Sequence, residues 1–455
     1  MHPSTHRTAP VALLALLLLG TISLGRANTS TDTIAQLRDQ LRALEQKILI
    51  LERQQELRDE AAATVAKSTP TLAAGPGGFS ITSADRGFQL RIRANLQVDG
   101  RFFLGDSIEG NDTFLIRRLR PSFEGTLGTK YAFRLMPDFA PSTFNLLDAY
   151  ATYTHSPAFN LLVGKTKTPF DLERLVSQTD LLFIERAYPT SLGPNRDLGV
   201  QVFGDLSEGR LSYQLALQNG VPDGGTSIVD TDDAKEIAAR IFTQPFKGDG
   251  SALEGLGLGI AVTTGEQNVG TPAVLRTNAQ QAFFAWAPGV LNAGRHERVS
   301  PQFHYYHGPL GFIGSHVSSR QTLARTGAPR DVTARAWFVG AHWVLTGEDA
   351  GPRGVTPRTA FSWSDGTWGA WEAAIRHGRL RVGDEAFTGT STSWFANPAT
   401  SASEARGTTL GLNWYLNRNV KASLNLEHID FAGGASGTVT REAEKALLTR
   451  VQLRY

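Results

Sequence analysis

From Phe79 onward the chain alternates apolar and polar residues over long stretches, and this period of two limits its fold more than any other feature. Residues 88–101, FQLRIRANLQVDGR, place six apolar side chains on one face and polar or charged side chains on the other. Residues 211–217, 420–427 and 450–455 repeat the pattern, with Gly and Asn/Asp turns between such segments. The pattern predicts strands of about ten residues, longer than the ~5–6 residues usual in soluble sandwiches.

The N-terminus has the features of an export signal. Weakly positive residues precede an apolar run at 11–25, and Gly25 and Ala27 supply small side chains for a cleavage site. The alternative is a retained transmembrane helix, which needs ~18–20 apolar residues, more than this run provides. We therefore expect residues 1–27 to be a signal peptide that is cleaved near Ala27.

An exported chain with long strands that are apolar on one face and polar on the other is typical of a transmembrane β-barrel. Half of each strand would line a wet lumen, so a mean hydropathy of −0.19 does not argue against membrane insertion. The last residues, RVQLRY, close on the aromatic Tyr455, as a final barrel strand does. Candidates for the aromatic belts at the membrane surfaces are Trp343, Trp363, Trp368, Trp371 and Trp414.

Residues 28–66 follow a helical period instead. Apolar side chains recur at alternating spacings of three and four, which is the seam of a coiled coil. The seam residues are Ile34, Leu37, Leu41, Leu44, Ile48 and Leu51. We expect a periplasmic coiled-coil helix that self-associates or contacts a periplasmic or cell-wall partner through residues 32–60; the alternative is an amphipathic helix packed on its own chain. Residues 67–78 are rich in Pro, Gly and Ala and predict a linker to a barrel domain at 79–455.

Composition excludes several kinds of site. The chain has no cysteine, so disulfides and cysteine-based zinc sites are impossible. Its net charge is only +2, and we expect no nucleic-acid partner. No nucleophile and base stand together in the sequence, so we expect no enzyme, no cofactor and no metal. The 36 arginines and 9 lysines fit either codon bias or a need for permanently charged anion binders.

Seven stretches, in the same order along the chain, resemble the phosphate-selective porins O and P. They are LQVDGRFF (96–103), FLIRRLR (114–120), DAYATY (148–153), GKTKTPFDLER (164–174), RDLGVQVFG (196–204), WVLTGE (343–348) and LGLNWYLNRNVKASLN (410–425). The resemblance spans roughly residues 79–455. It implies an all-β fold: a 16-stranded antiparallel transmembrane barrel that forms homotrimers in outer-membrane lipid. It also implies a third extracellular loop, in the region 165–186, that folds into the pore.

The resemblance also implies which residues bind the permeating anion. The matching motif positions predict an anion-binding constriction of Arg117, Arg118, Asp148, Arg174 and Arg186. Lys165 and Lys167 fall in the expected constriction loop. Further basic residues lie on the expected lumen faces and predict a row of positive charges, here called the ladder, along the pore. They are Arg91, Arg93, Arg101 and Arg120. The alternative is that each of them pairs with a nearby acidic residue. One departure is Asn95, which replaces a basic residue of the phosphate porin and puts phosphate preference, but not anion passage, in doubt.

These residue types suit anion transit. A permeating phosphate sheds water at a narrow point, and guanidinium groups replace that water with charge-assisted hydrogen bonds. We therefore expect an outer-membrane porin that passes phosphate, polyphosphate or other anions by diffusion. Two alternatives remain: a less selective anion or general porin, and a barrel-anchored structural protein that tethers partners through the coiled coil.

The stretch FLIRRLRPSF adds a local prediction. Arg117 and Arg118 are adjacent, so a regular strand would turn one of them toward lipid, at a cost of ~2–4 kcal/mol near the midplane. Pro121 also lacks the backbone donor that a strand ladder uses. We predict a β-bulge between Phe114 and Arg118 that turns both arginines into the lumen.

Overall fold

The computed structural model describes residues 30–75, 77–105, 110–140, 144–226, 229–230, 232–436 and 440–455. The predicted signal peptide lies outside these residues. The chain divides between Ser68 and Thr69 into a helical unit and a β-sheet unit, and each is considered by itself.

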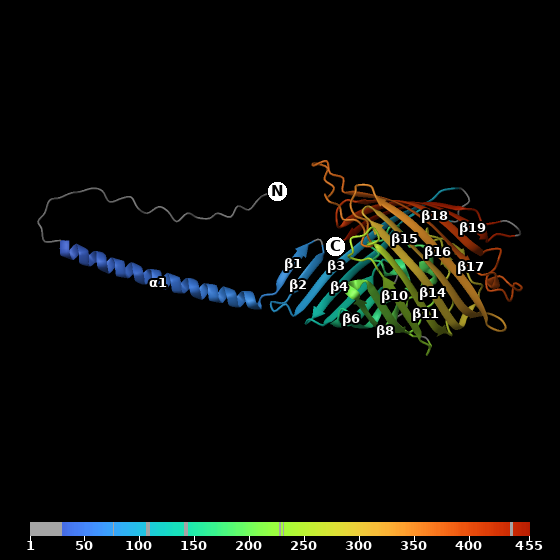
Figure 1. Ribbon diagram of the computed structural model, residues 1–455, viewed down its shortest axis with the longest axis horizontal. Coiled ribbons are helices and arrows are strands. Elements are labelled where there is room, and N and C mark those ends of the chain that lie inside the picture. The colour runs from blue at the N-terminus through green and yellow to red at the C-terminus, as the bar shows by residue number, and fades with distance from the viewer. Residues whose placement is uncertain are drawn as a thin grey trace. The chain divides into compact units, whose positions relative to one another are not determined.

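The first unit contains helix α1, Ser30–Ser68, a single element of 39 residues (Figure 1). Its seam residues are all exposed, from 47% at Ile48 to 63% at Leu51. Charged side chains pair along its surface, as Arg53 Nη1 does with Glu56 Oε2 at 2.9 Å. In the described part of the chain, no helix has both the length and the apolar character needed to cross a membrane.

The second unit is a closed barrel of 16 antiparallel strands (Figure 1), in agreement with the predicted fold class. In chain order its strands are β3 (Phe88–Phe103), β4 (Thr113–Leu127), β5 (Tyr131–Asp138), β6 (Asn145–Ser156), β7 (Phe159–Lys167), β8 (Arg196–Leu206), β9 (Leu211–Gln218), β10 (Glu236–Thr243), β11 (Leu256–Gln267), β14 (Leu291–His307), β15 (Leu310–Ala324), β16 (Arg330–Val344), β17 (Ala370–Val382), β18 (Ala402–Tyr415), β19 (Val420–Gly433) and β20 (Glu444–Arg454). Each strand pairs with its neighbours, and β20 pairs with β3 to close the sheet.

Short elements occupy several of the connections. They are α2 (Leu172–Leu175), the 3₁₀ turns η1 (Tyr188–Leu192), η2 (Ser207–Gly209) and η3 (Asp384–Ala386), and the two-stranded pair β12 (Leu275–Arg276) and β13 (Ala282–Phe284). Connections at one end of the barrel, here called the turn end, are mostly short, such as 157–158 and 416–419. The opposite end, the loop end, has long connections such as 168–195 and 268–290.

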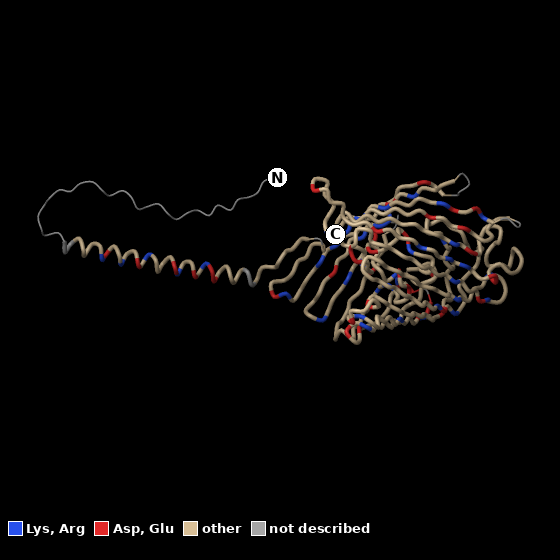
Figure 2. Tube along the Cα trace, turned by 45° about the horizontal axis from the view of Figure 1, so that its top comes forward, with Lys and Arg blue, Asp and Glu red and all other residues tan. Residues whose placement is uncertain are grey.

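The two faces of the wall follow the predicted alternation where β3 meets β20. Gln97, Asp99 and Arg450 point inward and are at most 3% exposed, whereas Val98 and Val451 are 39% and 53% exposed on the outside. Figure 2 shows acidic and basic residues intermingled along the strands. The lumen therefore carries mixed charge, which lets inward-facing ions find partners.

Part of the lumen at the loop end is apolar instead. Connections 268–290 and 383–401 pack onto inward-facing residues of β15, β16 and β17. Buried members of this cluster are Phe283, Phe284, Val317, Val332, Leu380 and Phe395. Because these loops exclude water from that side, the strands there need no polar inner face.

The segment predicted to be a linker, residues 67–78, is partly a β-strand in the structure. Within residues 67–78, Thr71–Gly75 form strand β1, which pairs with β2, Gly78–Thr82. Strand β2 in turn pairs with β3 over residues 89–92, next to the segment 95–103 that pairs with β20. The hairpin thus continues the sheet where the last strand ends, and Phe79 packs edge-on against Tyr455 with ring centroids 4.7 Å apart.

The predicted bulge in β4 is confirmed. Gln97 pairs with Arg118 and Val98 with Ile116, so Arg117 is an extra residue between two register positions. Arg117 bonds inward to Glu185, and Arg118 is only 3% exposed. The bulge avoids the lipid-facing arginine that a regular strand would require.

A buried ion pair between Arg450 of β20 and Asp99 of β3 joins the two strands that close the barrel, and its contribution to stability can be tested. Arg450 Nε and Nη2 each lie 2.7 Å from an oxygen of Asp99. We expect Arg450→Met to lower the free energy of unfolding by about 3–5 kcal/mol, because it leaves the Asp99 carboxylate buried and unpaired. Urea unfolding in detergent, followed by the gel shift between folded and unfolded barrel, measures this.

The matched control is Arg320→Met. Arg320 pairs with Asp331 at 2.6 Å, but both side chains are largely exposed. Such a pair contributes about 0–1 kcal/mol. If Arg450→Met and Arg320→Met lower the free energy of unfolding equally, the pair of Arg450 and Asp99 has no special role in closing the barrel.

Candidate functional site

The connection between β7 and β8, residues 168–195, lies inside the barrel and is here called the constriction loop. Phe170, Ile184 and Tyr188 on this loop are at most 2% exposed. It is the third connection at the loop end, which is the arrangement that the family resemblance implies. The loop contains one turn of helix, α2, whose N-terminus is capped by Asp171 Oδ2 accepting from Arg174 N at 2.8 Å.

Inward-facing side chains of the wall hold this loop by its backbone. They donate to its carbonyl oxygens: Gln97 to Gln178 at 3.1 Å, Lys421 to Leu181 at 2.8 Å, Asn413 to Leu182 at 2.8 Å, Arg450 to Ile184 at 2.6 Å and Arg376 to Glu185 at 2.9 Å. A largely irregular segment buried in protein must find such partners, since an unpaired buried carbonyl costs free energy. The loop is therefore fixed from several strands at once.

Glu185 is the electrostatic centre of the loop. Its carboxylate accepts two bonds from Arg117, at 2.6 and 3.2 Å. Arg118, Arg101 and Arg450 lie 3.8, 3.5 and 3.8 Å from the same carboxylate. Burial by itself raises the pKa of Glu185, but the surrounding guanidinium groups outweigh it and hold that pKa well below its usual range. Glu185 is therefore ionised at neutral pH.

The two arginines on the loop are bound differently. Arg174 Nη2 donates to the carbonyl of Thr190 at 3.1 Å, and its Nε has no hydrogen-bond partner among the described residues. Arg186 donates to the carbonyls of Glu173 and Val176 at 2.9 and 3.2 Å. Burial lowers the pKa of Arg174 to about 9 and that of Arg186 to about 10, so both stay charged at neutral pH.

Two cavities flank the constriction loop. One, of about 640 Å³, is lined by four of the five predicted constriction residues, Arg117, Arg118, Arg174 and Arg186, together with Glu185. The other, of about 550 Å³, is lined by loop residues 177–180 and by a second group of wall residues that includes Arg93, Asn95, Arg120 and Tyr455. Strand β4 lines both cavities, with Arg117 and Arg118 in one and Arg120 in the other.

The fifth predicted residue, Asp148, lies in β6 and lines neither of these cavities. Its carboxylate is 2.7 Å from Arg196 Nε and 3.4 Å from Arg134 Nε. Lys165 and Lys167 lie in strand β7 rather than in the loop itself. Lys167 Nζ donates to the carbonyls of Leu175 and Val176 at 3.2 and 3.1 Å, so it helps to hold the loop.

The predicted ladder residues are mostly in ion pairs. Arg93 lies 3.6 Å from Glu124, Arg101 3.5 Å from Glu185, and Arg120 2.7 Å from Asp138. Arg91 donates to Gln89 at 3.5 Å. This arrangement matches the alternative in which lumen arginines neutralise nearby acids.

Asn95, the residue that departs from the family pattern, is buried in the barrel wall. It is 5% exposed, lines the second cavity and pairs across the sheet with Arg120. Neither atom of its side-chain amide has a hydrogen-bond partner among the described residues. A longer basic side chain at this position would add positive charge to the second cavity.

Sequence reasoning missed the partners that organise the site. Glu185 directly precedes Arg186, yet the family resemblance implies a role for the arginine and none for the glutamate. The alternation over residues 450–455 puts Arg450 on a polar face, but its pairing with Asp99 depends on how the last strand β20 aligns with the first strand β3. Among the described residues, no cluster of His, Asp or Glu could hold a metal ion.

Comparisons with known proteins agree with this architecture. The family model described as phosphate-selective porin O and P matches residues 89–455. Porin O of Pseudomonas aeruginosa is 24% identical over 393 residues, which cover 76% of this chain and 84% of that protein. An uncharacterized protein of Caulobacter vibrioides is 28% identical over 226 residues, which cover 42% of this chain and 45% of that protein.

Solved structures give the same fold at low identity. The outer membrane channel DcaP of Acinetobacter baumannii has a TM-score of 0.55 at 13% identity, covering 83% of this chain and 100% of that chain. OmpT of Vibrio cholerae has a TM-score of 0.50 at 10% identity, covering 81% of this chain and 98% of that chain. These likenesses concern the barrel fold alone.

The role of Glu185 in fixing the loop can be tested by backbone exchange. We expect Glu185→Ala to speed amide hydrogen exchange across residues 178–192, because it removes the shared partner of several buried arginines. Exchange in β14–β16 should not change. Mass spectrometry of the folded barrel in detergent reports both regions.

Glu404→Ala is the control. Glu404 also binds two arginines, Arg379 and Arg406, but those side chains are 33% and 54% exposed. Unchanged exchange across residues 178–192 in Glu185→Ala would show that the carbonyl contacts alone hold the loop.

Proposed function

Because this outer-membrane barrel belongs to the phosphate-selective porin O and P family, we propose that it passes anions through the constriction by diffusion, with phosphate or polyphosphate as the preferred cargo. The family and the barrel make it a channel rather than an enzyme. The proposal concerns which ions pass and which residues select them.

One observation carries the proposal. Arg174 and Arg186 face the cavity of about 640 Å³, and no ion pair with a carboxylate is found for either in the described part of the chain. Their charge therefore remains available to an entering anion. Guanidinium groups suit this task, because their planar set of donors matches phosphate oxygens.

The neighbouring cluster adds positive charge. Among the described residues, two carboxylates lie within 4 Å of this group of four arginines, those of Glu185 and Asp99; the arginines are Arg101, Arg117, Arg118 and Arg450. The excess of positive charge in this cluster attracts anions, while the negative charge of Glu185 partly neutralises the arginines. A pore needs both properties, since an ion that binds too tightly does not leave.

The second candidate is a less selective anion pore. The ion-paired ladder arginines and the neutral Asn95 favour it, because both reduce the positive charge along the path. Zero-current potentials in a chloride gradient separate the candidates from a cation pore, and cation preference would rule out both.

The selective role of Arg174 predicts a loss of phosphate block. In single-channel recordings in chloride, added phosphate should reduce the wild-type current at micromolar to low millimolar concentration. We expect Arg174→Ala to raise the blocking concentration about 10-fold or more, since a charge-assisted hydrogen bond contributes ~1.5–3 kcal/mol. Arg118→Ala should also weaken the block, by removing charge from the same cavity.

Arg276→Ala is the control for this prediction. Arg276 lines the same cavity but is exposed and donates to the carbonyl of Gln280 at 3.0 Å. Its removal should change the block much less. A wild-type block that survives in both Arg174→Ala and Arg118→Ala would mean that these residues do not form the anion site.

We also propose that α1 associates with the same helix of other copies, separately from the homotrimer of barrels that the family resemblance implies. The exposed seam supports this, because six apolar side chains at coiled-coil spacing face solvent within the unit. A tether to a periplasmic or cell-wall partner is the alternative occupant of the seam.

Removing residues 30–68 tests the role of α1 while keeping the β1–β2 hairpin. We expect unchanged single-channel conductance, because the constriction is built from the barrel unit. Chemical crosslinking should show fewer oligomers, and Leu41→Glu with Leu44→Glu in the full chain should reproduce that loss. Full oligomer yield in both variants, with loss of attachment to the cell wall, would favour the tether.

A further inference from the structure

Asp171 joins two parts of the constriction loop that are 19 residues apart. Its Oδ2 caps the first turn of α2 by accepting from Arg174 N at 2.8 Å, and it also accepts from the hydroxyl of Thr190, in η1, at 2.8 Å. Both side chains are buried. This pair of Asp171 and Thr190, here called the clasp, ties the helical turn at the start of the loop to the 3₁₀ turn near its end.

The clasp holds Arg174 at both ends. Asp171 accepts from its backbone N–H, and the carbonyl of Thr190 accepts from its Nη2 at 3.1 Å. Arg174 and Thr190 line the cavity of about 640 Å³, whereas Asp171 is not among the described residues that line it. The direction in which the guanidinium enters the cavity therefore depends on a carboxylate behind the cavity wall.

The residues around the clasp leave it little freedom. Phe170 is fully buried in the apolar cluster at the loop end, and its carbonyl accepts from Gln302 Nε2 on β14. Gln302 Oε1 in turn accepts from Arg240 Nε on β10 at 3.1 Å. After η1 the chain returns so closely that a Cβ on Gly193 would lie 2.8 Å from the Phe170 ring and 3.8 Å from Asp171 Cβ. Asp171 is therefore fixed both from the wall and from the loop itself.

The charge of Asp171 makes its place beside an anion path unexpected. No salt bridge to Asp171 is found in the described part of the chain, and its Oδ1 has no hydrogen-bond partner there. A buried carboxylate without an ion pair costs free energy, and it repels the anions that the arginines attract. Its Oδ2 nevertheless accepts two hydrogen bonds, and both serve to hold Arg174 in place.

We propose that Asp171 is a positioning residue for anion selection and acts through Arg174. Its carboxylate fixes α2 and η1 to one another, and this sets the direction of the Arg174 guanidinium at the cavity. Charge-assisted hydrogen bonds are directional, so an arginine that is free to swing binds phosphate less well than one that is held in place. This role depends on the proposed binding of anions by Arg174.

The sign of the effect separates positioning from charge. Removal of a negative charge near the path, considered alone, strengthens phosphate binding. Because Asp171 positions Arg174, Asp171→Ala should instead raise the phosphate concentration that blocks the single-channel current, by about 5-fold, the size expected for the loss of a helix N-cap. Asp171→Asn keeps a side-chain oxygen that can accept from Arg174 N, so its channel should be blocked at the wild-type concentration or below.

Two further variants test the link to Arg174. In a channel that already carries Arg174→Ala, adding Asp171→Ala should change the block by less than about 2-fold, because the side chain that Asp171 positions is gone. Thr190→Val removes the hydroxyl of the clasp but keeps the carbonyl that binds Arg174, and it should weaken the block less than Asp171→Ala. If Asp171→Ala does not fold, as the gel shift of the barrel reports, Thr190→Val decides, and an unchanged block in it would contradict the clasp.

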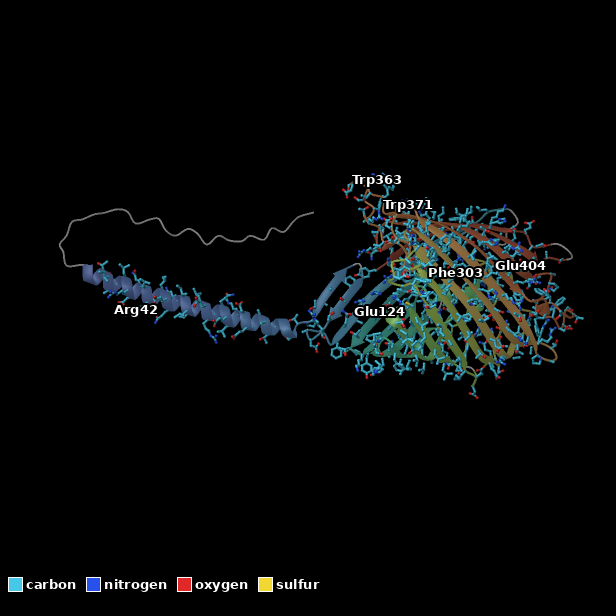
Figure 3. All side chains as sticks on the ribbon, in the orientation of Figure 1. Arg42, Glu124, Phe303, Trp363, Trp371 and Glu404 are labelled. Atoms are coloured by element: carbon cyan, nitrogen blue, oxygen red, sulfur yellow. The ribbon has the colours of Figure 1, made fainter. Side chains whose placement is uncertain are left out.

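Two acids elsewhere in the lumen control for charge. Asp232 lines the same cavity and accepts from the backbone of Ala234 and Asn268 at 3.0 and 3.1 Å. Glu124, on β4 and labelled in Figure 3, lines the second cavity. In the described part of the chain neither carboxylate bonds to Arg174, so Asp232→Ala and Glu124→Ala should leave the blocking concentration unchanged or lower it.

A tighter block in Asp171→Ala, as in these controls, would overturn the positioning role and leave only the charge of Asp171. Equal weakening by Asp171→Ala in the wild-type and Arg174→Ala channels would overturn it too, because Asp171 would then act independently of Arg174. Failure of the proposed function gives a different result: Arg174→Ala by itself leaves the wild-type block intact, which removes the role of both residues.

Discussion

The structure depends on one constraint: a largely irregular loop is buried inside a barrel and must have its backbone carbonyls satisfied. The wall meets this need with inward-pointing donors of four types, Gln97, Asn413, Lys421 and the arginines Arg376 and Arg450. This explains why the polar faces of the strands contain amides and cations rather than only small hydroxyl residues. The path of the loop through the barrel is then a consequence of where those donors stand.

Arginine serves two purposes in this lumen, and its partners separate them. Arginines on the wall bind carboxylates or loop carbonyls, and several of them lie around Glu185. Arginines on the loop bind carbonyls and keep their charge directed to the cavity. A high arginine content therefore does not by itself measure anion affinity, because much of the charge supports the loop.

The sequence was sufficient for features that depend on neighbouring residues. Alternation predicted the strands and their faces, and the adjacent Arg117 and Arg118 beside Pro121 predicted the bulge. Contacts between residues far apart in the chain could not be predicted from the pattern of neighbouring residues. The bond from Arg450 to Asp99 and the grouping of Arg101 and Arg117 on Glu185 require the register of closure and the path of the loop. The β1–β2 hairpin was missed because its Gly and Ala residues resemble a linker.

The divided pairing of β3 has a consequence for the order of assembly. Residues 89–92 of β3 find β2 nearby in the chain, but residues 95–103 must wait for β20, and the bonds that Arg450 donates to Asp99 span 351 positions. Until the last strand is made, that half of β3 is an open edge able to pair with the wrong chain. A chaperone that shields this edge would therefore remove one of the two open edges of the unfinished barrel, the other being the edge of β19 that also waits for β20.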